Sequence, residues 1–121
     1  MKYLILILFA ALAGYGLAGE NNEIDGVFES KINAIQNNDY QSFISNSTNE
    51  FSDTLKKPQF TDVSWTFGKN LAAGYTKDYQ GKYQQKGLDI HLYKISYKNG
   101  APENLYKMVM QGDKLAGFWI Q

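Results

Sequence analysis

The stretch that decides the fold is Leu88-Asp89-Ile90-His91-Leu92-Tyr93-Lys94-Ile95-Ser96-Tyr97. Apolar and polar residues alternate along it with the period of two that is typical of a strand with one buried face. The apolar positions are even-numbered up to Leu92 and odd-numbered from Tyr93 onward. One extra residue would reconcile the two halves, so the pattern predicts a β-bulge near Leu92 and Tyr93 that bends the sheet.

Further strands are predicted on both sides of this one. Downstream, Asn99-Gly100 opens a turn, residues 105–110 form a strand, residues 111–114 turn again, and residues 115–120 form the last strand. Upstream, residues 75–84 form a strand with one tyrosine-rich face, on which we expect Tyr75, Lys77, Tyr79, Gly81 and Tyr83. The second half of the chain is therefore an antiparallel meander of three to four strands.

The first half is predicted to be helical. Apolar residues recur at helical spacing in one stripe, formed by Ile24, Val27, Phe28, Ile32 and Ile35. We expect Asn22 to cap this helix and Asn37-Asn38 to end it. A second short helix is expected from Asp39. The capping box Ser47-Thr48-Asn49-Glu50 predicts a third, which ends before Pro58.

Residues 60–73 fit two interpretations. Val63, Phe67 and Leu71 recur every four residues, as in a helix, whereas Val63, Trp65 and Phe67 alternate, as in a strand. A step of four is compatible with both periods. We predict a helix, and with it an α+β fold in which N-terminal helices pack on one face of a curved antiparallel sheet.

Residues 1–18 are predicted to be a secretory signal peptide. A positive start at Lys2 is followed by the apolar run Tyr3–Ala13 and by Gly16-Leu17-Ala18, a small-x-small cleavage pattern. The alternative is an uncleaved membrane anchor, but the run is eleven residues long, against the roughly 20 that a spanning helix needs. We expect a secreted or periplasmic protein whose single domain is residues 19–121, with membrane contact only through the signal peptide.

Composition excludes several classes of protein. The chain has 121 residues, no cysteine and one histidine, and all 12 of its basic residues are lysine. Disulfide scaffolds, thiol nucleophiles and cysteine metal sites are therefore excluded. A net charge of zero without arginine argues against a nucleic-acid partner. Without residues 1–18, which contain Lys2, the net charge is −1, divided between an acidic half, residues 19–65 at −5, and a basic half, residues 66–121 at +4.

Three short motifs carry a family resemblance. They are the step Asn38-Asp39-Tyr40, the turn Gly112-Asp113, and the closing phrase Gly117-Phe118-Trp119-Ile120. Together with the order of helices and strands, they resemble the nuclear transport factor 2-like superfamily, and most of all its small secreted bacterial members. The resemblance implies a cone-shaped, cystatin-like fold with a cavity between helix and sheet. Members act as enzymes, ligand binders or dimerisation modules, so the fold alone does not give the function.

Two features could carry chemistry. Asp89 and His91 lie on one strand face, and such a pair could bind a metal or act as base and orienting group. Because Leu88, Ile90 and Leu92 occupy the other face, the alternative is that Asp89 and His91 simply face solvent. No second histidine completes a metal triad, and we predict no metal and no cofactor.

The second feature is a set of tyrosines, which combine an apolar ring with a polar tip. They could line a ligand cavity, form a partner-binding sheet, or stabilise a half-buried sheet by cross-strand contacts. The candidate ligand-binding residues are Tyr75, Tyr79, Tyr83, Tyr93, Tyr97, Tyr106, Trp65 and His91. We predict a non-catalytic domain that binds a small molecule in its cavity or a protein through its sheet, with a homodimer among the expectations.

Two alternatives remain. One is a small isomerase- or hydrolase-like enzyme. The resemblance to steroid-isomerase-type members implies an acid and tyrosines in such a cavity, but no residue of this chain maps onto that site. The other is an inhibitor or adhesin-like module, which would present a flat aromatic patch instead of a cavity.

Overall fold

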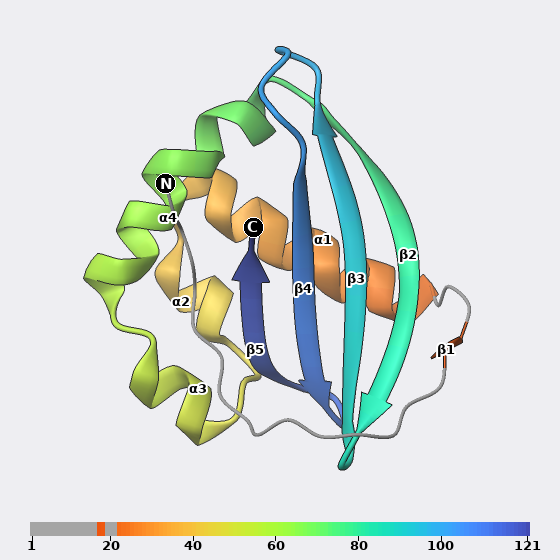
Figure 1. Ribbon diagram of the computed structural model, residues 1–121. Coiled ribbons are helices and arrows are strands. Elements are labelled where there is room, and N and C mark those ends of the chain that lie inside the picture. The colour runs from red at the N-terminus through yellow and green to blue at the C-terminus, as the bar shows by residue number, and fades with distance from the viewer. Residues whose placement is uncertain (1–16, 19–21) are drawn as a thin grey trace.

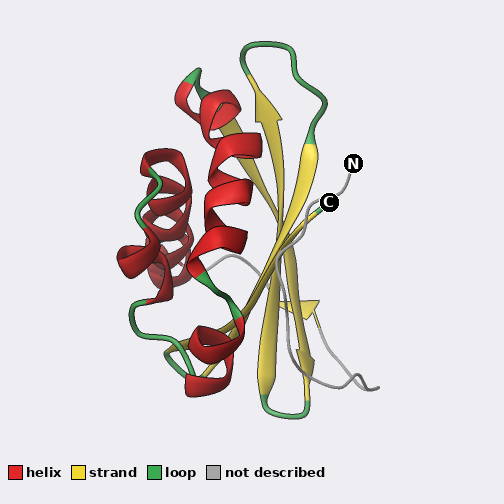
Figure 2. Cartoon of the chain, turned by 90° about the vertical axis from the view of Figure 1, so that its left-hand side faces the viewer, coloured by secondary structure: helices red, strands yellow, loops and turns green. Residues whose placement is uncertain are grey.

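The architecture consists of two layers, with helices on one side and an antiparallel sheet on the other (Figures 1 and 2). It was obtained as a computed structural model, which describes residues 17–18 and 22–121. The apolar run and most of the predicted signal peptide lie outside the described residues. None of the described helices combines the length and apolar character needed to cross a membrane.

The helices follow the predicted order. They are α1 (Asn22–Asn37), α2 (Tyr40–Ile44), α3 (Asn49–Thr54) and α4 (Lys57–Ala72). α1 ends where predicted, because Asn38 adopts a positive φ of 54° that a helix cannot continue. The side chain of Asp39 accepts a hydrogen bond from the Ser42 amide and so caps α2. The helix interpretation of residues 60–73 is confirmed.

One helix boundary differs from the prediction. Thr48, not Ser47, caps α3 by accepting a bond from the Phe51 amide at 3.2 Å, whereas the Ser47 hydroxyl donates to the Ile44 carbonyl. α3 ends before Pro58, as predicted, and Pro58 itself lies in the first turn of α4. Proline is favourable there because its missing N–H would have no partner within the helix.

The sheet contains four long strands and a two-residue edge strand. In spatial order they are β1 (Leu17–Ala18), β2 (Tyr75–Gln85), β3 (Leu88–Tyr97), β4 (Asn104–Gln111) and β5 (Lys114–Ile120), all antiparallel to their neighbours. The predicted α+β class is thereby confirmed. β1 comprises the last two residues of the predicted signal peptide, so cleavage after Ala18 would remove it from the edge of β2.

The predicted bulge occurs at the expected level of the sheet but in the neighbouring strand. β3 pairs regularly with β4, whereas in β2 the register passes from Tyr79↔Tyr93 to Gly81↔Leu92, which leaves Gln80 as the extra residue. The bulge moves Tyr83 to the face opposite Tyr79. The prediction that residues 75 to 83 share one tyrosine face was therefore wrong beyond position 79.

Both faces of the sheet carry apolar side chains near the bulge. Tyr93 packs into the main core under the helices, whereas Ile90 belongs to a second cluster with Val109 and Ala116. Tyr83, Leu88 and Leu92 pack against this second cluster. The parity switch in β3 thus reflects a change in which face its apolar residues cover, and it requires no extra residue in β3.

α1 lies across the sheet and is held from both sides (Figure 1). On the sheet side, the Phe28 ring stacks on Tyr93, with 3.8 Å between centroids. On the other side, the Ser64 hydroxyl of α4 donates to the Ile35 carbonyl at 2.6 Å. A Cβ at Gly68 would come within 3.2 Å of that same carbonyl. Gly68 therefore allows the two helices to approach closely.

Candidate functional site

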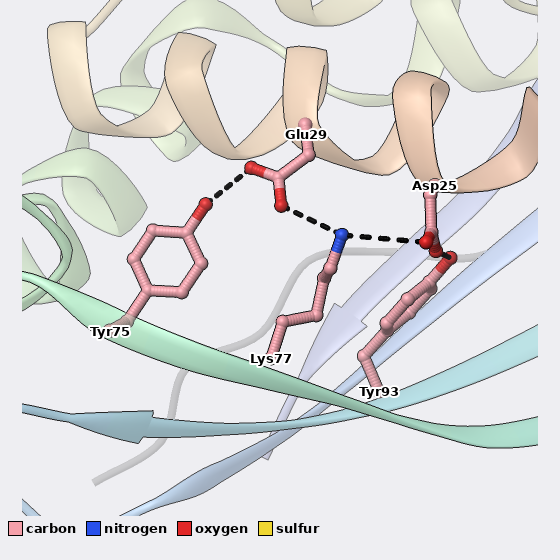
Figure 3. A network of polar contacts seen from close by, with 5 residues as sticks. All are labelled: Asp25, Glu29, Tyr75, Lys77 and Tyr93. Atoms are coloured by element: carbon pink, nitrogen blue, oxygen red, sulfur yellow. Dashed lines mark hydrogen bonds and ion pairs between the residues drawn. The ribbon is translucent and has the colours of Figure 1, made fainter. Parts of the chain in front are cut away.

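A polar seam joins α1 to the sheet (Figure 3). We use this name for Asp25, Glu29, Tyr75, Lys77 and Tyr93. Asp25 and Glu29 lie one turn apart on α1, and both face β2 and β3. Lys77 Nζ lies 2.8 Å from Glu29 Oε2 and 3.7 Å from Asp25 Oδ2. The Tyr93 hydroxyl donates to Asp25 Oδ1 at 2.8 Å, and the Tyr75 hydroxyl donates to Glu29 Oε1.

The electrostatics of the seam match these contacts. Partial burial by itself lowers the pKa of Lys77, but the hydrogen bond and charge of Glu29, followed by Asp25, raise it overall. Burial, and then the bond to Glu29, raise the pKa of Tyr75 well above its usual range. The Lys77 ammonium and the Tyr75 phenol are thus protonated at neutral pH, and each carboxylate accepts bonds from the residues of the seam. A carboxylate engaged in this way is a weak general base, so the seam chiefly ties α1 to β2 and β3.

His91 lies beside this seam, facing the helices. Its side chain is 2% exposed, so the predicted alternative of a solvent-facing His91 was wrong. Nδ1 lies 3.0 Å from the Tyr79 hydroxyl, and which atom donates depends on the tautomer. Nε2 has no hydrogen-bond partner among the residues that the structure describes. A buried polar atom without a partner is rare in proteins, and a bound molecule is one explanation for it.

The charge state of His91 follows from its surroundings. Desolvation lowers the pKa of its imidazole, Lys82 lowers it further, and the opposing effect of Asp89 does not restore the usual value. The ring is therefore neutral at pH 7, with one nitrogen protonated and the other able to accept a bond. Nε2 offers either a single donor or a single acceptor to whatever lies against it.

Two further tyrosines form a closed hydrogen-bond chain within the core. The Tyr97 hydroxyl donates to Asn104 Oδ1 at 2.6 Å and lies 2.9 Å from the Tyr106 hydroxyl. Burial raises the pKa of Tyr97 to about 12 and raises that of Tyr106 well above its usual range. Both hydroxyls already have partners within the protein. These contacts match the third predicted role of the tyrosines, cross-strand stabilisation of the sheet.

The candidate residues from the sequence therefore separate into three places. The helix-facing side of the sheet holds His91 and five tyrosines, which are Tyr75, Tyr79, Tyr93, Tyr97 and Tyr106. Tyr83 lies on the opposite face with the second apolar cluster. Trp65 is 76% exposed on α4, where it lines an open hollow of about 300 Å³ with Gln36 and Lys69.

The sequence did not indicate the charged members of the seam. Asp25 resembled an ordinary acidic residue of a helix's first turn, and Glu29 an exposed position on its polar face. The available signal was Lys77, a charged residue between Tyr75 and Tyr79 on the predicted tyrosine face. A lysine on a face otherwise directed at the core needs a buried partner.

Metal binding has no support from side-chain geometry. No group of three or more histidine, aspartate or glutamate side chains within residues 17–18 and 22–121 is arranged to hold a metal ion. The second histidine that a triad would need is absent from the sequence.

Comparison with known proteins gave no relative. No family model, curated protein or solved structure matches this chain. The resemblance to the nuclear transport factor 2-like superfamily therefore remains a prediction from sequence.

Proposed function

We propose that this protein is a non-catalytic domain that binds a small molecule between α1 and the β2–β3 part of the sheet. The observation that carries the proposal is the buried, neutral imidazole of His91, whose Nε2 has no partner among the described residues. An unpaired polar atom in the interior costs about 1 to 3 kcal/mol. A ligand that bonded to Nε2 would recover this cost, and complementary shape would add apolar contact with the neighbouring rings.

A small molecule explains this atom better than a protein partner does. His91 is 2% exposed, so the surface of another protein would have to part the two layers to reach Nε2, whereas a small molecule would need only local side-chain movement. Tyr79 and Tyr93 meet edge to face near His91, with ring centroids 5.0 Å apart, and would supply apolar contact to a ligand bonded to Nε2. Ligand sites typically combine apolar walls with a few polar groups that fix the orientation of the ligand.

Catalysis is the weaker candidate because the acidic groups are already engaged. Asp25 and Glu29 share Lys77 and each accepts a tyrosine hydroxyl. An enzyme of the isomerase type would need one carboxylate free to take a proton from its substrate. The predicted resemblance is to a superfamily that includes ligand binders as well as enzymes, so it is compatible with binding. Because residues 1–18 are predicted to be a signal peptide, we also propose that binding takes place outside the cytoplasm.

Native mass spectrometry of the protein purified from the organism that makes it tests the proposal. We expect a non-covalent mass increment that is released by denaturation. His91→Asn and His91→Gln form a matched pair, because an asparagine amide reaches the position of Nδ1 and a glutamine amide reaches that of Nε2. His91→Asn should lose the increment and His91→Gln should retain part of it. Tyr83→Phe, on the opposite face, should retain all of it.

Two results would overturn the proposal. A bare wild-type protein would indicate that a trapped water explains Nε2, since buried waters commonly pair such atoms. Equal retention of the increment by His91→Asn and wild type would place the ligand elsewhere.

A further inference from the structure

Lys31 is a second unusual group, and it lies outside the seam. It belongs to the buried side of α1 and is only 4% exposed, although it carries an ammonium group. Charged lysines are almost never buried to this degree unless they are paired. No carboxylate of the described residues forms an ion pair with Lys31, whereas Lys77 on β2 contacts two. The interior therefore holds an amine without a counter-charge.

Two backbone carbonyls fix the position of this amine. Nζ donates to the Ser45 carbonyl at 3.0 Å and to the Ser42 carbonyl at 3.3 Å, at the C-terminal end of α2. A neutral amine has two N–H bonds and one lone pair, so two acceptors use all of its hydrogens. The ammonium form would have a third N–H left over. The two carbonyls can accept from either form, and burial lowers the pKa of Lys31 to about 8, so the neutral, nucleophilic form is populated near neutral pH.

A hollow of about 150 Å³ adjoins this amine. It is lined by Val27, Ser30, Lys31, Ser45, Asn46, Met110, Asp113 and Leu115. Its volume is that of about five water molecules, which suits a compound of a few heavy atoms. The polar residues Ser30, Ser45, Asn46 and Asp113 are among those that line it. None of its lining residues belongs to the seam, and His91 is not among them.

We propose that Lys31 is the nucleophile of a covalent site for short hydroxyaldehydes, held by the Ser42 and Ser45 carbonyls at the wall of this hollow. The neutral Nζ attacks the carbonyl carbon, the C=O π electrons move to oxygen, and a proton passes from nitrogen to oxygen to give a carbinolamine. Loss of the second N–H proton with that hydroxyl releases water and leaves an imine. When protonated, the imine keeps one N–H for the nearer carbonyl, Ser45. The ligand hydroxyl bonds to the polar wall.

Glycolaldehyde with cyanoborohydride tests the site, because reduction makes the imine permanent. Wild-type protein is treated at pH 7.5 and the modified lysines are located by peptide mass mapping. About a quarter of Lys31 is neutral at this pH, against about one in a thousand for an ordinary lysine. We expect Lys31 to react at least tenfold faster than the exposed Lys57 and Lys69 of the same molecule. The comparison needs no variant.

Two controls separate the site from general lysine reactivity. In urea the advantage of Lys31 should vanish, because the hollow and both carbonyl contacts are lost. With a bulky aromatic aldehyde the advantage should vanish in the folded protein, because the hollow is too small. Reaction of folded Lys31 with glycolaldehyde no faster than the exposed lysines would refute the proposal. An equal advantage with the bulky aldehyde would also refute it.

Discussion

Lys31 makes the unfolding free energy depend on pH in a window where few other groups titrate. The pKa of Lys31 is about 8 in the folded protein and 10.5 when exposed. Below pH 8 both states carry the proton, and the folded state bears the full cost of the buried charge. At 1.36 kcal/mol per pKa unit, the 2.5-unit difference corresponds to about 3.4 kcal/mol. Between the two pKa values only the unfolded state binds the proton, so stability rises with pH.

From pH 7 to pH 9 this linkage predicts a gain of about 1.3 kcal/mol in the unfolding free energy. His91, whose pKa is lowered by burial, is neutral throughout this window. Tyr75, Tyr97 and Tyr106 act with the opposite sign: their folded pKa values are raised, so they reduce stability only as pH rises through about 10. The window therefore isolates Lys31.

The assay is urea denaturation at pH 7, 8 and 9, followed by tryptophan fluorescence, on wild type and Lys31→Met. Methionine keeps the apolar stem but leaves the Ser42 and Ser45 carbonyls without this donor, so absolute stabilities differ for two reasons. The change of the unfolding free energy with pH has only one of these causes, because methionine does not titrate. We expect wild type to gain about 1.3 kcal/mol relative to Lys31→Met over the window. Parallel curves for the two proteins would refute the assignment of an uncompensated buried amine.

Two further changes test the seam and the helix packing. Lys77→Met removes the cation shared by Asp25 and Glu29, and should cost about 1 to 2 kcal/mol in urea denaturation at pH 7. The loss should shrink as acid protonates the carboxylates, and a loss unchanged at pH 4 would contradict the ion-pair assignment. Gly68→Ala should destabilise the protein, because the new Cβ meets the Ile35 carbonyl. Gly26→Ala, in open space on α1, should stabilise it by about 0.5 to 1 kcal/mol; equal effects at both positions would contradict close packing of α1 and α4.

The sequence predicted the elements well because their signals are local. Helical spacing, capping residues and turn glycines act within a few positions, and they placed α1, α2 and the four long strands within one or two residues. The bulge was assigned to β3 because one strand's pattern cannot show which of two paired strands carries the extra residue. The structure places it at Gln80 in β2. The capping box of α3 was one residue out because Ser47 and Thr48 are both good caps.

The site was harder to predict because its contacts join distant parts of the chain. Asp25 meets a tyrosine 68 residues away, and Glu29 meets one 46 residues away. Each acid read in isolation is an ordinary polar helix residue. His91 read in isolation lies on the strand face that the leucines avoid. That face becomes interior only because α1 packs on the sheet. The residue pattern of β3 alone does not predict this packing.

The state of His91 is the most direct test of the proposed binding site. The chain contains a single histidine, so the long-range ¹H–¹⁵N spectrum of its imidazole is free of overlap. Ligand-free protein should show one neutral tautomer at pH 7 and a pKa below the usual 6.5, and the Nε2 resonance should move when the co-purified small molecule is restored. A pKa of 6.5 or above, with both tautomers in fast exchange and Nε2 unmoved by the ligand, would contradict a buried imidazole that receives it.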